Sequence, residues 1–281
     1  MIRLTRLLMF VAVTAATAIA PVLADKMAMP SVNITSPASG ATVTSTNIPV
    51  TVTIKNFDLE CVDAGKPGKP GRGHVHAMLD GMSMAQLTNV ECGDTFTVSG
   101  VGIKPGKHNL TVMLASDDHM PASMPSTIKF NYEPTKSQPL PKPESVGQPT
   151  LSIISPQAGA SVTRKFNVRV AITNLDSSCA LEGKPNVIGY GHLHVFANQT
   201  GVTDQKPMNM KMEMPSSGMM GAEGSMKMES MVGMVSMPCA TTIPVDLSTW
   251  RPGPARITVM LAGNDHMPLS AKPSSIVVNV K

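Results

Sequence analysis

Six of the seven histidines in this 281-residue chain fall into two groups with matching motifs. Each group has two histidines separated by one residue and a third inside an Asp-His-Met-Pro motif. The groups are His74, His76 and His119 (the first triplet), and His192, His194 and His266 (the second triplet). In a β-strand, residues i and i+2 project from one face about 6.5–7 Å apart, so each His-x-His pair places two imidazoles side by side. With a third imidazole from elsewhere in the fold, and with Met120 or Met267 adjacent to it, each group predicts a metal site.

The alternative interpretation of the triplets is structural. The imidazoles can bond to backbone carbonyls and to the neighbouring Asp118 or Asp265, which would fix the corner that carries the third histidine. The same aspartates can instead orient a ligating imidazole. A lone histidine would favour the structural interpretation, whereas the occurrence of three histidines together in both groups supports metal binding as strongly as the structural interpretation.

A second concentration of donor atoms lies in residues 208–237, where 11 of 30 residues are Met, against 12 in the other 251. The predicted ligands recur at spacings of two and three: Met208, Met210, Met212, Met214, Met226, Met228, Met231, Met234 and Met237. The segment has four Gly and no Leu, Ile or Phe, which disfavours a core helix. Thioether sulfur selects Cu(I) or Ag(I) over hard cations. We predict Cu(I) capture here; an adaptable binding surface and a reversible sink for oxidants are the alternatives.

The elements that must position these residues are duplicated. Cys61 and Cys179 each precede the first histidine of their triplet by 13 residues, and Cys92 and Cys239 each precede the last by 27. Matching residues of the two copies differ by 118 in residue number up to the His-x-His motif and by 147 from the second cysteine onward. Copy two therefore carries 29 extra residues between its His-x-His motif and its second cysteine. The repeat suggests the disulfides Cys61–Cys92 and Cys179–Cys239, as expected for an even cysteine count in an exported chain. Thiolate metal ligation is the less favoured alternative because no Cys-x-x-Cys pair exists.

Each copy has the sequence pattern of a β-domain. Residues 49–55, 95–98, 126–130 and 167–172 alternate between apolar and polar side chains, and Gly, Pro and Asn separate such runs. About seven short strands in roughly 100 residues predict an immunoglobulin-like β-sandwich, with a small barrel as the alternative. We expect domains over residues 31–133 and 151–281, joined by a Pro-rich linker over 134–150.

Three motifs together resemble a family of exported bacterial Ig-like domains of unassigned function. In copy one these are the GHVH of residues 73–76, the PGKH of 105–108 and the DHMP of 118–121. The resemblance covers both copies, but copy two has PGPA at 252–255, and the family's second histidine near the corner is absent from both. The resemblance implies the fold and an exported location, and it implies no reaction. The Met-rich stretch resembles those of periplasmic copper-handling proteins.

The N-terminus and the composition narrow the possible compartments and partners. Residues 1–24 are predicted to be a cleaved signal peptide, with Arg3 and Arg6 before an apolar run over 7–20 and a small residue, Ala24, at the cut. A membrane anchor is disfavoured because a span needs about 20 apolar residues, and no later segment is predicted to cross a membrane. We expect a periplasmic or secreted protein. Loss of the two arginines lowers the net charge from +4 to +2, and no basic run exists, which excludes a nucleic-acid reader.

These features lead to three functional hypotheses. The first is an exported copper-binding protein for sequestration, delivery or tolerance, with copper as the bound metal and zinc less favoured. The second is a non-catalytic Ig-like module of the cell envelope that binds a protein or glycan partner. No hydrolase elbow, phosphate loop, dinucleotide fingerprint or His-Glu-x-x-His motif is present, so we expect no enzyme activity. A copper-dependent redox reaction at the open triplets is the third hypothesis.

Overall fold

The computed structural model describes residues 28–144, 147–199 and 233–281. These residues form two β-sandwiches, one for each repeat, and their only helices are two short 3-10 turns, η1 (Met84–Gln86) and η2 (Cys179–Leu181). The predicted signal peptide and residues 200–232, which include most of the Met-rich segment, lie outside the described residues. The predicted all-β fold is therefore confirmed for the part of the chain that is described.

Domain 1 is built from two sheets that face each other. The smaller sheet has the order β1-β3-β7, with β1 (Ser31–Ser36), β3 (Ile48–Lys55) and β7 (Thr95–Val98). The larger sheet has the order β2-β9-β8-β5-β4, and β6 also pairs with β5. Its strands are β2 (Thr42–Val43), β4 (Asp58–Leu59), β5 (Arg72–Leu79), β6 (Leu87–Glu91), β8 (Gly106–Ser116) and β9 (Ser126–Tyr132).

Domain 2 repeats this arrangement. Its smaller sheet, β10-β12-β16, consists of β10 (Thr150–Ser155), β12 (Lys165–Thr173) and β16 (Thr242–Asp246). The larger sheet has the order β11-β18-β17-β14-β13, and β15 also pairs with β14. Its strands are β11 (Ser161–Val162), β13 (Asp176–Ser177), β14 (Tyr190–Gln199), β15 (Met234–Ser236), β17 (Gly253–Ala262) and β18 (Ser274–Val280).

The strand order is that of an immunoglobulin-like sandwich. In that fold, strands A, B and E share one sheet, and C, F and G share the other. Here β1, β3 and β7 occupy the first set of places, and β5, β8 and β9 the second; β10 to β18 follow the same scheme. The two sheets of each domain share no ladder among the described residues, so the alternative of a small barrel is wrong.

Alternation along the strands explains the core of each domain. In β3, Ile48, Val50 and Val52 are buried while the residues between them are more exposed. Aliphatic residues from both sheets fill the interior of each sandwich, together with Phe96, Phe130 and Tyr132 in domain 1 and Trp250 in domain 2. Burial of this apolar area is what holds the two sheets together. The four alternating runs identified in the sequence coincide with β3, β7, β9 and β12.

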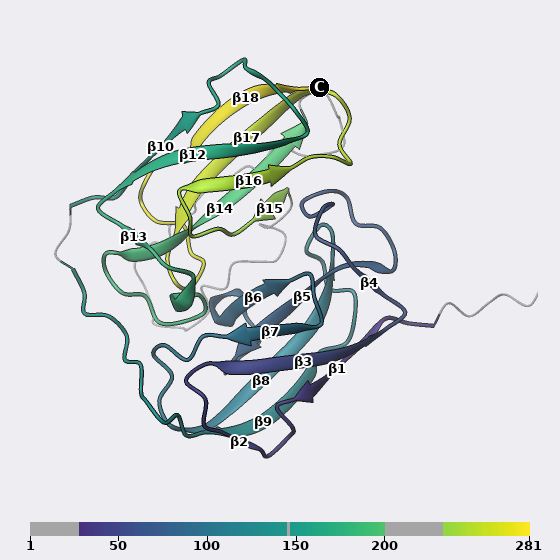
Figure 1. Ribbon diagram of the computed structural model, residues 1–281, viewed down its shortest axis with the longest axis vertical. Helices are drawn as coiled ribbons and strands as arrows, with labels where there is room; N and C mark the ends of the chain where they lie inside the picture. Colours follow the sequence, from purple (N-terminus) through teal and green to yellow (C-terminus); the bar gives the residue numbers. More distant parts are fainter. Residues whose placement is uncertain (1–27, 145–146, 200–232) are drawn as a thin grey trace, which may run out of the picture.

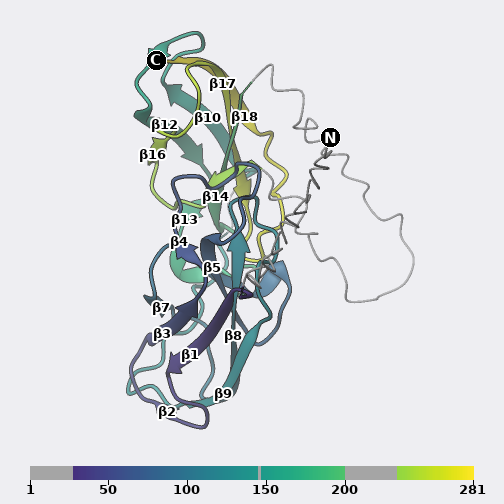
Figure 2. The same ribbon diagram turned by 90° about the vertical axis from the view of Figure 1, so that its right-hand side faces the viewer.

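The two domains pack against each other through their larger sheets. Figure 1 shows domain 2 above domain 1, with β5 and β6 of domain 1 next to β14 and β15 of domain 2, and Figure 2 shows the same end-to-end arrangement from the side. A cluster of buried residues drawn from both domains fills this contact: Met78, Met84, Leu87, Met113, Phe196, Met234 and Met260. We call these residues the interdomain cluster.

The described residues that connect the domains form no regular element. Strand β9 ends at Tyr132 and β10 begins at Thr150, and the described residues between them form neither helix nor strand. Across all described residues, no helix has the length and apolarity that a membrane crossing would require.

Candidate metal centre

The His-x-His motifs lie on β5 and β14, strands that are buried on both faces. On β5, Val75, Ala77 and Leu79 point into the core of domain 1. The alternate residues, His74, His76 and Met78, face the other side of the sheet, and they are also buried. Without domain 2, that side would face solvent. The second domain therefore excludes water from the histidine face.

The third histidine of each triplet occupies a strained corner. His119 follows β8 and His266 follows β17, and both have a φ of 63°, a left-handed conformation that is uncommon for residues with a side chain. In domain 1, the His119 N–H donates to the Ser116 carbonyl, and the Ser116 N–H donates to the Met120 carbonyl. Such backbone strain costs of the order of 1 kcal/mol and persists where surrounding contacts demand it. The corner turns the imidazole back over the strand that carries the His-x-His pair.

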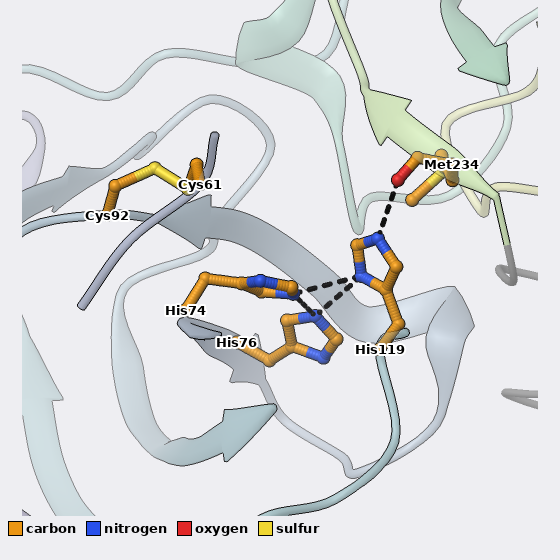
Figure 3. Close-up of a disulfide and its surroundings, with 6 residues drawn as sticks. All are labelled: Cys61, His74, His76, Cys92, His119 and Met234. Carbon is orange, nitrogen blue, oxygen red and sulfur yellow. Dashed lines mark hydrogen bonds between the residues drawn. A yellow bond between two sulfur atoms is a disulfide. The ribbon is translucent and has the colours of Figure 1, made fainter. Parts of the chain in front are cut away.

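The imidazoles of the first triplet converge on one point (Figure 3). His74 Nε2 lies 3.0 Å from His76 Nε2 and 2.9 Å from His119 Nδ1, and His76 Nε2 lies 3.4 Å from His119 Nδ1. All three side chains are almost completely buried.

The second triplet reproduces this geometry. His192 Nε2 lies 2.9 Å from His194 Nε2 and 3.1 Å from His266 Nδ1, and the third distance is again 3.4 Å. The same nitrogens are used in both domains: Nε2 of the two strand histidines and Nδ1 of the corner histidine. The convergence is therefore repeated in both copies of the fold.

The spacing of the nitrogens fits a small metal ion. Three nitrogens that each lie about 2.0–2.1 Å from a tetrahedral metal are about 3.3 Å apart, which is close to both sets of observed distances. Three neutral imidazoles suit zinc and copper. The residues present therefore match a three-histidine site with one open position in each domain.

Each corner histidine is held by the other domain. The His119 Nε2–H donates to the carbonyl of Met234 in β15 at 2.9 Å (Figure 3). In the reverse direction, the His266 Nε2–H donates to the carbonyl of Leu87 in β6 at 2.7 Å. Because a neutral imidazole carries one N–H, these bonds leave Nδ1 of both corner histidines as a bare lone pair directed into the triplet. A carbonyl in this position orients and polarises a ligating imidazole.

Burial keeps the triplets uncharged. Desolvation, reinforced by the neighbouring imidazoles, lowers the pKa of His76 and of His194 to about 3 and that of His74 and His192 well below its usual value. Burial also lowers the pKa of His119 and His266, although the bonds to the Met234 and Leu87 carbonyls oppose this. At neutral pH all six rings are free bases, the form that binds a metal.

Hydrogen bonding alone does not satisfy the triplets. Nδ1 of His74 and Nδ1 of His192 are buried, and neither has a hydrogen-bond partner among the described residues. If the proton of His74 sits on Nδ1 it has no acceptor; if it sits on Nε2 it can serve only one of the two nitrogens that face it. A buried polar atom without a partner costs about 1–3 kcal/mol, and a cation at the centre would use the converging lone pairs.

Comparisons with known proteins give only weak structural likenesses. No protein-family model matches the chain, and no curated protein does. Among solved structures, the fibronectin(III)-like modules of Clostridium thermocellum CbhA are 13% identical, with 89% of this chain and 94% of that chain covered and a TM-score of 0.26. The chicken CNTN1 FN1-FN3 domains are 10% identical, with 90% and 65% covered and a TM-score of 0.24. Likeness this weak says nothing about function.

The predicted methionine ligands lie in different places. Met120 and Met267 follow the corner histidines, but their side chains are 41% and 37% exposed. Met234 is buried in the interdomain cluster, and Met237 packs against it. The remaining predicted ligands lie outside the described residues: Met208, Met210, Met212, Met214, Met226, Met228 and Met231.

Both predicted disulfides are confirmed. Cys61 pairs with Cys92, and Cys179 pairs with Cys239. The atoms of Cys179, Glu182 and Cys239 lie close enough to suggest a third metal cluster. Because both sulfurs are in a disulfide, they offer no thiolate, and this cluster is not a cysteine metal site.

A cavity of about 490 Å³ opens beside the first triplet. Its lining includes His119, Met234 and Met237, the buried carboxyl of Glu182, and residues of both disulfides. Burial, with a smaller contribution from Glu91, raises the pKa of Glu182 to about 8, so this carboxyl is mostly protonated at neutral pH. The cavity therefore borders one imidazole of the first triplet, that of His119.

Sequence reasoning missed the glycines that let the domains approach. Gly65 and Gly183 occupy the same place in a repeated Gly-Lys-Pro motif, a signal that was available. A Cβ on Gly65 would lie 2.8 Å from the Gly233 carbonyl carbon, and one on Gly183 would lie 2.7 Å from the Leu87 carbonyl oxygen. The backbones that carry the two accepting carbonyls therefore pass directly over these glycines.

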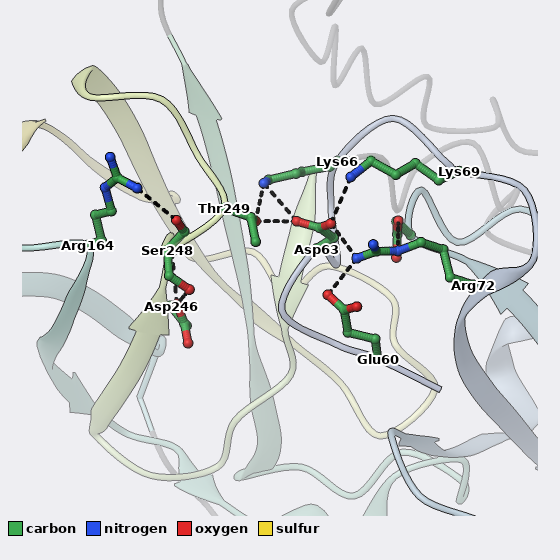
Figure 4. A network of polar contacts seen from close by, with 10 residues as sticks. Glu60, Asp63, Lys66, Lys69, Arg72, Arg164, Asp246, Ser248 and Thr249 are labelled. Carbon is green, nitrogen blue, oxygen red and sulfur yellow. Dashed lines mark hydrogen bonds and ion pairs between the residues drawn. The ribbon is translucent and has the colours of Figure 1, made fainter. Parts of the chain in front are cut away.

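A polar network also joins the domains, on one side only (Figure 4). Asp63 of domain 1 is paired with Lys66 at 2.8 Å, Lys69 at 3.1 Å and Arg72, and it accepts a hydrogen bond from the Thr249 hydroxyl of domain 2. Burial by itself would raise the pKa of Asp63, but the bonds from Lys66, Thr249 and Lys69 outweigh it and hold the pKa far below its usual range. The matching position in domain 2 is Leu181, so the network has no second copy.

Proposed function

We propose that this protein binds metal ions in its two buried histidine triplets, and that copper is the metal it handles. The observation that carries the proposal is the duplicated convergence of three neutral imidazole nitrogens at 2.9–3.4 Å from one another. A structural histidine cluster is expected to direct its nitrogens to carbonyls and hydroxyls. Here only the outer nitrogen of each corner histidine is used in this way.

Copper is favoured by the composition of the rest of the chain. Imidazole suits Cu(II) and zinc, whereas thioether suits Cu(I), and the residues 208–237 supply 11 thioethers. Two disulfides fit an oxidising compartment, where thiols are poor ligands and thioethers remain available. We infer a role in sequestration, delivery or tolerance in a periplasmic or secreted protein, with the Met-rich segment as the Cu(I) donor or acceptor.

The test is metal loading of the mature chain, purified without a histidine tag. Zn(II) and Cu(II) are the probes because thioethers bind them poorly, so the Met-rich segment should not contribute. We expect the protein to bind about two equivalents of either metal and to melt at a higher temperature when loaded. His76→Asn and His194→Asn should each remove one equivalent. His108→Asn is the matched control. His108 is the seventh histidine; it belongs to neither triplet, and its Nδ1 lies 2.7 Å from the Asp80 carboxylate.

Substoichiometric copper and an unchanged melting temperature would overturn the proposal. The chain would then be better described by the second hypothesis, a module of the cell envelope that binds a protein or glycan partner. The Ig-like fold is the only support for that alternative.

A further inference from the structure

In the part of the chain that the structure describes, the buried methionines are confined to the contact between the domains. Five methionines are buried among the described residues, and all five belong to the interdomain cluster: Met78, Met84, Met113, Met234 and Met260. The cores of the two sandwiches are larger, and they contain no Met in the described residues. If methionine served here only as an adaptable core residue, it would be expected in all three clusters.

Strand register sets two of these methionines against the triplets. Across the β5–β8 ladder, His76 is the direct partner of Met113. Across the β14–β17 ladder, His194 is the direct partner of Met260. Direct partners in an antiparallel pair project from the same face with Cβ atoms about 4.5–5.5 Å apart. Each methionine therefore stands beside a histidine whose Nε2 points into the triplet.

The residues opposite the other two strand histidines are small. His74 and His192, the other strand histidines, face Ala115 and Ala262 across the same ladders. Met113 and Met260 are 9% and 4% exposed, so their thioethers are shielded from water. They occupy the same place in the repeated Thr-Val-Met-Leu-Ala sequence, and hence the arrangement exists twice.

We propose that Met113 and Met260 each supply the fourth ligand of the adjacent triplet, so that each site is three imidazoles and one thioether. This inference rests on the proposed metal-binding function and makes it more specific. A neutral donor set with one thioether favours Cu(I) or Ag(I) over Zn(II), because the thioether is soft and adds no negative charge. The exposed Met120 and Met267 are then not required as ligands.

The test replaces only the sulfur-bearing side chains. Met113→Leu and Met260→Leu are close to isosteric, and such swaps usually cost less than about 1.5 kcal/mol. They are made together in a full chain whose nine methionines between 208 and 231 are replaced by Ser, so that thioethers of that segment do not bind the probe. The matched control is Met82→Leu with Met124→Leu, which are 61% and 78% exposed.

The measured quantities are the affinities for Cu(I) and for Zn(II), obtained by competition with chelators. We expect the Met113/Met260 double variant to bind Cu(I) about 10–100-fold more weakly, the usual consequence of losing a ligand or its support, with Zn(II) binding unchanged. The control should match its parent for both metals. Copper X-ray absorption of the parent should show one sulfur neighbour per Cu(I), and it provides the readout if the double variant does not fold.

The outcomes separate this inference from the proposed function. Equal Cu(I) affinity in parent and double variant, or a copper spectrum without sulfur, would overturn the thioether ligands while Zn(II) binding still supports the triplets. If the parent binds neither Cu(I) nor Zn(II), the proposed function fails, and the inference fails with it.

Discussion

At the scale of single residues, some side chains at matching positions of the two repeats have different surroundings. Lys66 and Lys184 occupy the same place in the Gly-Lys-Pro motif. Lys66 pairs with Asp63 and lies over the ring of Trp250 at 5.5 Å. Lys184 is 4% exposed, and its Nζ has no hydrogen-bond partner among the described residues. Burial lowers the pKa of Lys184 to about 8, although Asp80 opposes this.

Lys184→Met is expected to stabilise the protein. Removal of a buried charge without a partner should raise the free energy of unfolding by about 1–3 kcal/mol at pH 7, as measured by urea denaturation. Lys66→Met, the matched control, should lower it, because Asp63 loses a partner. Effects of the same sign would show that the two lysines have equivalent environments and contradict the prediction.

The pKa of Lys184 also predicts a pH dependence. The usual pKa of lysine is 10.5. Between about pH 8 and pH 10.5, the folded protein has lost the Lys184 proton while the unfolded chain keeps it. Stability rises with pH wherever the unfolded state binds more protons, so the contribution of Lys184 becomes more favourable across this range. The Lys184→Met variant should lack that contribution. The measurement is the free energy of unfolding of the parent and of the variant as a function of pH, and the difference between the two should shrink as the pH rises.

At the scale of elements, the strands that meet at the domain contact depend on Gly65 and Gly183. Both glycines have a positive φ, at 84° and 70°, and both lie against the backbone of the opposite domain. Gly40 and Gly159 have a φ of 80° but nothing within 4 Å of an added Cβ. All four glycines therefore have a positive φ, but only Gly65 and Gly183 lie against the backbone of the opposite domain.

We expect Gly65→Ala or Gly183→Ala to weaken the contact between the domains. Gly40→Ala and Gly159→Ala should cost only the strain of a positive φ, about 1–2 kcal/mol. The first pair should cost clearly more, since the partner backbone must move, and should also loosen the bond from His119 or His266 to its carbonyl. Thermal unfolding measures the cost, and amide hydrogen exchange near β6 and β15 measures the loosening. Equal costs at all four glycines would show that the close approach is unimportant.

At the scale of the whole molecule, contacts of three kinds join the two domains into one unit. The interdomain cluster, the two reciprocal histidine bonds and the Asp63 network all cross the contact. Each triplet contains an imidazole oriented by the opposite domain. Binding of a metal that needs this orientation should therefore also favour the closed arrangement of the domains.

A cut in the linker tests this unity. A protease site inserted between Lys142 and Pro143, which are both exposed, would sever the connection and leave the interdomain cluster unchanged. We expect the two fragments to stay together on size-exclusion chromatography and to unfold in one transition. Phe196→Ser, which places a hydroxyl in the interdomain cluster, should let the cut fragments separate. Two independent transitions in the cut but otherwise unchanged chain would contradict the prediction.

Much of this architecture could be predicted from the sequence because the relevant patterns are local or repeated. Alternation along β3, β7, β9 and β12 indicated strands, since burial on one face imposes a period of two. The equal distances from cysteine to histidine in both copies indicated the disulfides. The His-x-His spacing predicted that two imidazoles share a strand face, and the structure adds that the corner histidine joins them.

Only the tertiary structure decided how the two domains meet and what surrounds each triplet. The bonds from His119 to Met234 and from His266 to Leu87 join residues 115 and 179 positions apart. No local pattern encodes such pairs, because they depend on the fit of two complete surfaces. The same holds for Met113 and Met260: their types and repeat were visible in the chain, but their position beside a histidine follows from strand register, which is fixed only when the sheet forms.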